Sequence, residues 1–212
     1  MSFVMHSVRT PRTARYAQNR PVSPETRSIW FLLHGYQQLA DDFIRSFAPI
    51  ERPDVVFVAP EALSRSYVRG TDGQVGASWM TRVEREAEIA DQIDYLDRVL
   101  DHVVPDDYTG RIGVLGFSQG VAAMTRWMRF GSIDPQVAVL YSGAPAREAV
   151  PDWGDGRSYH VVHESEPADW MKPYIKPFEA FLDTLPDEVH RFRYLGGHVV
   201  HPDALDYLKP LL

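Results

Sequence analysis

Cysteine is absent from this sequence, and so are long apolar runs. Without cysteine, disulfide bonds, thiolate zinc sites, iron–sulfur clusters and a cysteine nucleophile are all excluded. The longest apolar stretches, such as residues 29–33, have the length of a strand and fall far short of the roughly 20 residues of a membrane span. Prolines within residues 1–24 argue against a transit peptide. We therefore expect a soluble, cytoplasmic protein without a transmembrane segment.

Positive charge is also scarce, with 22 lysine and arginine residues against 29 aspartate and glutamate residues and a net charge of -7. This balance opposes a phosphate backbone, so no nucleic-acid partner is expected. The 14 glycines and 16 prolines are spread along 212 residues, of which 44% are hydrophobic, so disorder and low-complexity repeats are excluded. A chain of this size predicts one globular domain over residues 1–212, present as a monomer or a homodimer.

Short β-rich runs alternate with amphipathic helical patterns, which predicts βα units on a mostly parallel central sheet flanked by helices. Strands are predicted at residues 28–33, 55–59, 111–117, 137–141, 159–163 and 189–194, with two outer strands at 3–8 and 13–18. Helices are predicted at residues 40–47, 89–103, 119–130, 173–184 and 202–208. The aperiodic residues 61–80 predict a loop that lines a site, whereas residues 142–158 leave room only for a loop. No large cap domain is therefore expected, and the site should be open.

The strongest chemical signal is Gly116-Phe117-Ser118-Gln119-Gly120, which matches the pattern G-x-S-x-G. A buried strand precedes it and a helical pattern follows it, which is the strand–turn–helix setting of a nucleophile elbow. The two glycines allow the strand and the helix to approach closely, so that the serine hydroxyl projects from the carboxyl edge of the sheet. Ser118 is therefore the predicted nucleophile.

A serine nucleophile needs a base, and the base needs an orienting acid. His198 follows the last predicted strand on a glycine-containing loop, where it could reach Ser118. His201 competes for the role, but it precedes Pro202 at the start of the last predicted helix, a position typical of a helix cap. We favour His198 as the base.

An oxyanion hole is predicted at the same edge of the sheet. His34-Gly35-Tyr36 closes the first buried strand, and a free backbone N–H there can point at a developing negative charge. The N–H of Tyr36 and the N–H of Gln119 would together supply two donors. An H-G pair after a strand is a weak signal alone, and the elbow predicted at the same edge of the sheet supports this assignment.

Two pairs of histidines, His160 with His163 and His198 with His201, raise the question of a metal site. Residues three apart in a strand face opposite sides, so His160 and His163 cannot share one ion. No acidic cluster supplies the remaining ligands. We expect no metal.

These motifs resemble those of the carboxylesterase and phospholipase family of α/β-hydrolase-fold enzymes, which includes acyl-protein thioesterases. The similarity covers most of the chain. It rests on the H-G turn at His34-Gly35, the proline-containing turn at residues 59–62, Trp79 before a helix, G-F-S-Q-G at residues 116–120, and G-H-x-x-x-P-[ED]-x-L at residues 197–205. The resemblance implies an α/β-hydrolase fold with a Ser, Asp, His triad in that chain order, no cofactor, and a small-molecule ester as substrate. It also supports His198 over His201.

The chain departs from the family at the acyl pocket, where W-F-D-I is replaced by Trp79-Met80-Thr81-Arg82. With no cap domain, the bulky side chains available to wall this side of the site are those of Tyr67, Trp79 and Met80, beside Tyr36. Large side chains fill a groove, so the pocket is expected to be shallow.

The chain also departs from the family at the acid, because Pro167 stands four residues after His163, where the family has aspartate. Asp169 is our preferred acid, since it retains the D-x-x-x-P spacing to a following proline. Glu166 is the alternative, since Glu166-Pro167 imitates the D-P pair with one residue deleted. A glutamate is longer and could make up the lost reach.

We therefore expect hydrolysis of carboxylic esters with short or medium acyl chains, and also of thioesters or lysophospholipids, through an acyl-serine intermediate. Two alternatives stay open: a serine peptidase on the same fold, and a hydrolase-fold binding protein without catalysis. Activity on a panel of peptide amides, compared with a panel of esters, distinguishes a peptidase from an esterase. Labelling by a fluorophosphonate probe distinguishes a catalytic serine from a binding protein without catalysis.

Overall fold

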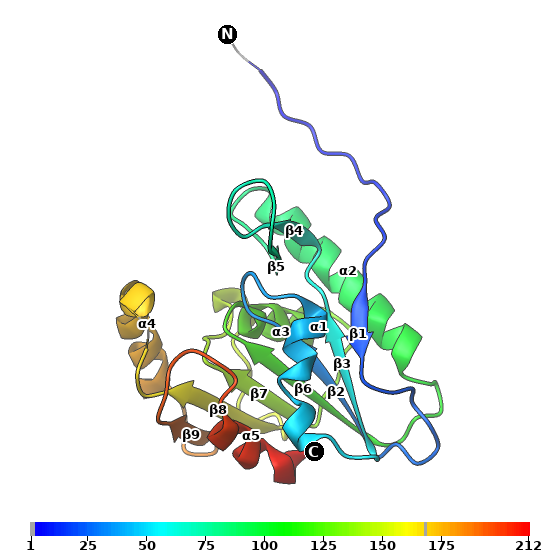
Figure 1. The fold of residues 1–212 in the computed structure, drawn as a ribbon, viewed down its shortest axis with the longest axis vertical. Coiled ribbons are helices and arrows are strands. Elements are labelled where there is room, and N and C mark those ends of the chain that lie inside the picture. Colours follow the sequence, from blue (N-terminus) through cyan, green and yellow to red (C-terminus); the bar gives the residue numbers. More distant parts are fainter. Residues whose placement is uncertain (1–2, 168) are drawn as a thin grey trace.

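The computed structural model describes residues 3–167 and 169–212, and within them seven strands form one sheet in the order β1-β3-β2-β6-β7-β8-β9 (Figure 1). The strands are β1 (Tyr16–Gln18), β2 (Ser28–Leu33), β3 (Val55–Pro60), β6 (Arg111–Phe117), β7 (Val137–Tyr141), β8 (Ser158–Glu164) and β9 (His190–Tyr194). β1 is antiparallel to β3, and all other neighbouring strands are parallel. The carboxyl ends of six strands therefore share one edge, and the antiparallel β1 begins at that edge.

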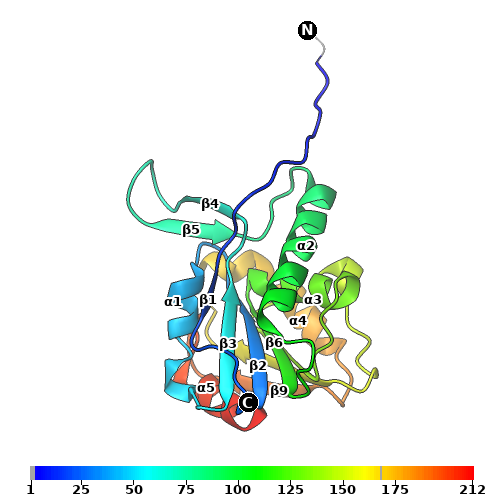
Figure 2. The ribbon, with the colours of Figure 1, turned by 90° about the vertical axis from the view of Figure 1, so that its right-hand side faces the viewer.

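Helices cover both faces of this sheet. They are α1 (Ala40–Arg45), α2 (Arg85–Val103), α3 (Gln119–Phe130), α4 (Lys172–Asp183) and α5 (Pro202–Leu208). α1 and α5 pack on one face, and α2, α3 and α4 on the other (Figure 2). Every residue of β2 is buried, with Ile29 and Phe31 in the cluster under α2 and α3 and Trp30 in the cluster under α1. An unbroken apolar run is what a parallel strand covered on both faces requires.

The neighbouring strands β2 and β6 are followed by connections that leave in opposite directions. The chain goes from β2 through α1 to β3 on one side, and from β6 through α3 to β7 on the other. A crevice opens at the carboxyl ends of two such strands, and ligands of open α/β sheets bind there. The turn after β2 and the residue after β6 are the two places where the sequence predicts the oxyanion hole and the nucleophile.

Most of the predicted elements are confirmed, but two predictions at the edges of the fold are wrong. Residues 3–8 form no strand: they are exposed, and β1 itself is limited to Tyr16–Gln18. Residues 61–80 contain a hairpin of β4 (Ser64–Tyr67) and β5 (Val75–Ser78). β4 is mostly exposed, so it lacks the apolar alternation that reveals a half-buried strand.

The connection between β7 and β8 bears on access to the site. Among the described residues it contains one short helical turn, η2 (Arg147–Ala149), so no large cap covers this edge. The hairpin of β4 and β5 projects from the carboxyl edge of the sheet (Figure 2). None of the helices within residues 3–167 and 169–212 combines the length and the apolar character that crossing a membrane requires.

Candidate active site

Ser118 occupies the sharp turn between β6 and α3 in a backbone conformation that is rare for a residue with a side chain. Its φ is 54° and its ψ is -116°. The neighbouring glycines make the turn possible: a Cβ on Gly116 would lie 2.5 Å from the carbonyl oxygen of Gly120, and one on Gly120 would lie 2.1 Å from that of Leu33. Strain of this kind gathers at functional sites. The predicted strand–turn–helix setting is confirmed.

His198 lies on the loop after β9, and its partner is a carboxylate at the end of the adjacent strand. Its Nδ1 is 2.7 Å from Oε1 of Glu164, the last residue of β8. Both side chains are nearly enclosed, with exposures of 9% for His198 and 5% for Glu164. Phe117 and Trp170 pack against the imidazole, at ring-centroid distances of 4.8 and 5.4 Å. Since Phe117 precedes Ser118, these contacts place the imidazole beside the elbow.

The protonation of this pair follows from its surroundings. Burial, the largest single influence, would raise the pKa of the Glu164 carboxyl, but the hydrogen bond from His198, further hydrogen bonds and the charge of His198 together outweigh burial, and the pKa lies below its usual value. An ionised carboxylate only accepts hydrogen bonds, so Nδ1 of His198 carries the proton and donates it. In the neutral imidazole, Nε2 is then the acceptor, and it is buried without a hydrogen-bond partner among the described residues. Within residues 3–167 and 169–212, Nε2 of His198 forms no hydrogen bond with Oγ of Ser118.

The prediction that Asp169 orients the base is corrected by this geometry. The Asp169 side chain is 94% exposed and pairs with Nζ of Lys172 at 2.9 Å. Glu166, the alternative, is exposed as well. The family motif directs attention to the loop beyond His163, whereas the strand continues for one more residue and ends on Glu164. Glu164 pairs with Tyr194 across β8 and β9, so a carboxylate there faces the loop that carries His198. That strand register is the signal that sequence reasoning missed.

His160, His163 and His201, the histidines considered as a base or as metal ligands, make structural contacts. His201 caps α5, since its Nδ1 accepts a hydrogen bond from the N–H of Asp203 at 3.2 Å, as its position predicted. His160 hydrogen-bonds to Tyr207 of α5, whereas His163 packs against Phe178 of α4. Because α4 and α5 lie on opposite faces of the sheet, the imidazoles of His160 and His163 do not meet.

The turn after β2 lies against the elbow and is held by the fully buried His34. A Cβ on Gly35 would lie 2.9 Å from the Gln38 side-chain oxygen and 3.0 Å from the Phe117 ring, so glycine lets the turn approach the elbow without displacing these side chains. Nε2 of His34 accepts a hydrogen bond from the N–H of Ala62 at 3.0 Å. Nδ1 therefore carries the proton and donates to the carbonyl oxygen of Gly35 at 2.7 Å. Burial lowers the pKa of His34, which keeps the ring neutral in this role.

This hydrogen bond fixes the direction of the next N–H. The carbonyl of Gly35 and the N–H of Tyr36 belong to one planar trans peptide, so they point in opposite directions. With the carbonyl turned towards His34, the Tyr36 N–H points away from it. Neither this N–H nor that of Gln119, the first residue of α3, has an acceptor within the described residues. Unpaired N–H groups at a turn and at a helix start are what an oxyanion requires.

The residues predicted to wall the acyl pocket occupy different positions. Trp79 is 3% exposed, and its Nε1 donates to the carbonyl oxygen of His34 at 2.7 Å, so its side chain supports the turn from within. Met80 is half-buried, and its carbonyl accepts a hydrogen bond from Nε2 of Gln119 at 3.2 Å. Tyr67 is 48% exposed on the hairpin. Trp79 is thus corrected to a support of the turn, whereas Met80 contacts Gln119 and Tyr67 is exposed on the hairpin.

Known structures share this fold. An acyl-protein thioesterase 2 from Zea mays aligns with 94% of this chain and 97% of its own length, at 18% identity and a TM-score of 0.66. A carboxylesterase from Bacillus cereus aligns with 93% of this chain and 92% of its own, at 14% identity and a TM-score of 0.64. The esterase PE8 aligns with 94% of this chain and 98% of its own length, at 20% identity and a TM-score of 0.59. No protein-family model and no curated protein sequence matches the chain. The chain therefore has the α/β-hydrolase fold that its motifs predict.

Proposed function

We propose that this protein is a serine hydrolase that cleaves carboxylic esters through an acyl-serine intermediate. The observation that carries the proposal is the conjunction, at one sheet edge, of a strained serine elbow and a histidine whose Nδ1 is bonded to a buried carboxylate. The N–H groups of Tyr36 and Gln119, which have no acceptor among the described residues, follow β2 and β6 at the same edge. Nucleophile, base, acid and oxyanion donors are the four parts that acyl transfer needs.

In the proposed mechanism, Oγ of Ser118 attacks the ester carbonyl carbon while Nε2 of His198 accepts the hydroxyl proton. The hydrogen bond between Ser118 and His198 tightens when substrate is bound, as catalytic hydrogen bonds commonly do. Glu164 keeps the proton of His198 on Nδ1 and stabilises the imidazolium that forms. The negative charge on the carbonyl oxygen is met by the N–H groups of Tyr36 and Gln119.

The tetrahedral intermediate then collapses, and the imidazolium of His198 returns the proton to the departing alkoxide. This leaves an acyl group on Oγ of Ser118. Water then attacks the acyl carbon while Nε2 of His198 accepts its proton, which gives a second tetrahedral intermediate. When this intermediate collapses, the bond between the acyl carbon and Oγ of Ser118 breaks, and His198 returns the proton to Oγ. The products are a carboxylic acid and an alcohol, and no redox step or cofactor enters the balance.

The substrate class is proposed from the openness of the site and from the relatives of the fold. Esters with short or medium acyl chains fit a crevice that has a hairpin beside it and no cap. Thioesters and lysophospholipids react by the same chemistry, and the structural neighbours are named as esterases and an acyl-protein thioesterase. We propose Met80 and Tyr67 as contacts of the acyl chain, since Met80 contacts Gln119, the residue after Ser118, and Tyr67 is exposed on the hairpin that precedes Met80.

A fluorophosphonate probe, followed by panels of esters and peptide amides, tests the proposal. We expect labelling of the wild-type protein, no labelling of Ser118→Ala, and hydrolysis of esters in preference to amides. Preferential cleavage of peptide amides would instead favour a peptidase on the same fold. Absence of labelling and of hydrolysis in the folded wild-type protein would favour a binding protein without catalysis.

A further inference from the structure

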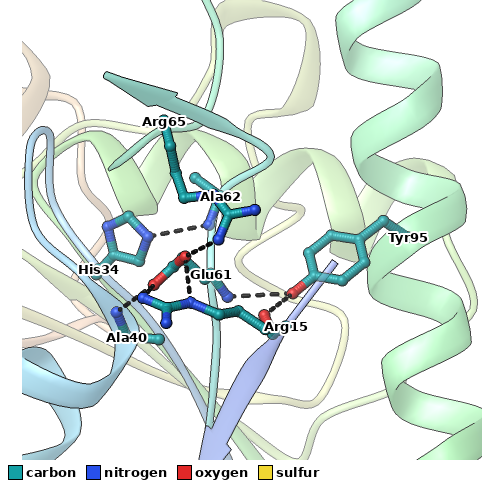
Figure 3. Close-up of polar contacts among 7 residues, drawn as sticks. All are labelled: Arg15, His34, Ala40, Glu61, Ala62, Arg65 and Tyr95. Carbon is teal, nitrogen blue, oxygen red and sulfur yellow. Dashed lines mark hydrogen bonds and ion pairs between the residues drawn. The ribbon is translucent and has the colours of Figure 1, made fainter. Parts of the chain in front are cut away.

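Glu61, the residue directly after β3, carries a buried carboxylate beside residues 34–40, which follow β2 and are called the oxyanion turn below (Figure 3). Its side chain is only 2% exposed. The guanidinium of Arg15 donates to both of its oxygens, Nε to Oε1 and Nη2 to Oε2, each at 2.7 Å. Arg65 adds a longer contact of 3.4 Å to Oε1. Two arginines thus compensate one buried negative charge, in a cluster that the proposed mechanism does not use.

The carboxylate also holds the far end of the oxyanion turn. Oε2 of Glu61 accepts a hydrogen bond from the N–H of Ala40, the first residue of α1, at 3.2 Å. The near end is held by the next residue in the chain, because the N–H of Ala62 donates to His34. The segment 34–40, which contains the proposed donor of Tyr36, is therefore fixed at both ends by the adjacent residues Glu61 and Ala62 (Figure 3).

The backbone of Glu61 is hydrogen-bonded to Arg15, the residue before β1, and to Tyr95 of α2. Its N–H is 3.1 Å from the carbonyl oxygen of Arg15 and 3.1 Å from the hydroxyl oxygen of Tyr95. That hydroxyl donates in turn to the carbonyl of Arg15 at 2.7 Å. Arg15 thus meets Glu61 through both its side chain and its backbone, although 46 residues separate the two in sequence.

We infer that Glu61 is a positioning residue for the oxyanion hole and that Arg15, from the N-terminal segment, is the counterion it needs. The inference rests on the proposed function. Glu61 touches no substrate; it acts by holding residues 34–40 so that the Tyr36 N–H stays directed at the developing oxyanion. A bidentate arginine and carboxylate pair fixes distance and angle together, which a single point charge does not.

This role predicts a specific kinetic pattern. A donor that drifts from the oxyanion weakens the transition state more than the ground state, so kcat falls while KM changes little. Complete loss of one oxyanion donor costs about 10²- to 10³-fold in kcat, and misplacement of a donor should cost about 10- to 100-fold. Affinity for a boronic acid, whose tetrahedral adduct with serine presents an oxygen to the same donors, should fall by a similar factor.

The experiment compares Glu61→Gln, Arg15→Met and Arg15→Lys with the wild-type protein. We expect Glu61→Gln and Arg15→Met to lose about 10- to 100-fold in kcat and in boronic-acid affinity, with KM within about twofold. Arg15→Lys keeps the charge but loses the bidentate geometry, so it should lie between Arg15→Met and the wild type. The Arg15 variants keep the test decisive if Glu61→Gln does not fold.

Asp155→Asn is the matched control. Asp155 pairs with Arg157 and accepts a hydrogen bond from the Tyr159 hydroxyl, in the loop before β8 and therefore at the opposite edge of the sheet. We expect this variant to lower the thermal stability without lowering kcat. A loss of kcat in Asp155→Asn equal to that in the Glu61 and Arg15 variants would show a general structural effect and overturn the inference.

Failure of the inference and failure of the proposed function give different results. If the wild type labels at Ser118 and hydrolyses esters while folded Glu61→Gln and Arg15→Met keep kcat within twofold, the inference alone is overturned. If the folded wild type neither labels nor hydrolyses, both are overturned.

Discussion

Glu164 and His198, 34 residues apart in sequence, meet at 2.7 Å because the strands that precede them are neighbours in the sheet. Glu164 is the last residue of β8, and His198 lies on the short loop that follows β9. An acid on a strand is held by the register of the sheet, whereas an acid on the following loop is held only by local turns. Glu164 is thereby oriented in a nearly enclosed setting, which strengthens its interaction with His198.

Replacing Glu164 by Gln should lower kcat by about three to four orders of magnitude if the protein is folded. A neutral amide can donate to Nδ1, which shifts the imidazole proton to Nε2 and removes the acceptor for the serine proton. Steady-state kinetics on a soluble ester, with folding checked by circular dichroism, measures this effect.

Asp169→Asn is the matched control for that variant. Because the Asp169 side chain is 94% exposed and pairs with Lys172 at the surface, its loss should leave kcat within about twofold. If kcat fell by orders of magnitude in folded Asp169→Asn and stayed near the wild-type value in Glu164→Gln, Asp169 would be the acid instead of Glu164.

Gly120→Ala should destabilise the protein, because the added Cβ would lie 2.1 Å from the carbonyl oxygen of Leu33 in β2. Overpacking of this kind costs about 1–3 kcal/mol, and in a chain of this size each kcal/mol lowers the melting temperature by about 2–4 °C. Gly154→Ala is the control, since its nearest neighbour would be an Asp152 side-chain oxygen at 3.7 Å. Thermal unfolding of both variants measures the difference, and equal melting temperatures would contradict the close approach of strand and helix.

Glu148 should make the stability sensitive to acid. Burial opposes its ionisation, but the hydrogen bond from Arg126, at 2.7 Å, a backbone hydrogen bond, the charge of Arg126 and the hydrogen bond from Arg85 together outweigh burial and lower its pKa to about 2. A pKa that is lower in the folded state adds stability above the usual value of 4.5, and this stability is lost as the pH falls towards 2. Melting temperatures of the wild type and Glu148→Gln should therefore differ at pH 6, and the difference should shrink below pH 4.5 and approach zero near pH 2. A constant difference across this range would refute the assignment.

The open edge of the sheet predicts a limit on acyl-chain length. Each methylene that is buried contributes up to about 0.8 kcal/mol, so kcat/KM rises with chain length only while the crevice covers the chain. We expect kcat/KM to reach its maximum at short or medium esters, measured below the concentration at which they form micelles. A steady rise from acetate to palmitate would contradict an uncapped, shallow site.

The central strands and the elbow were predictable because their signals are local. Burial on both faces requires an unbroken apolar run, as in residues 28–33, and the elbow requires glycine at fixed positions around Ser118. The hairpin of β4 and β5 was missed because its exposed residues carry no apolar alternation. Residues 3–8 were assigned to a strand on composition, which does not reveal whether a partner strand lies beside them.

The acid was missed because its place depends on pairing between strands. Nothing around Glu164 in the sequence separates it from a surface glutamate at a strand end; only the register of β8 with β9 brings it to the loop of His198. The support of the oxyanion turn by Glu61 and Arg15 is equally non-local, because it joins the N-terminal segment to the end of β3. Long-range pairs of this kind follow from topology, and topology has to be known before they can be named.

The central claim is that Ser118 forms the covalent intermediate under the control of His198 and Glu164. Peptide mass spectrometry after a short exposure to a fluorophosphonate tests it most directly. We predict a single adduct, on the peptide that contains Ser118, formed rapidly in the wild type, slowly in Glu164→Gln and not at all in Ser118→Ala. An adduct on another residue, or full ester hydrolysis by Ser118→Ala, would contradict the mechanism.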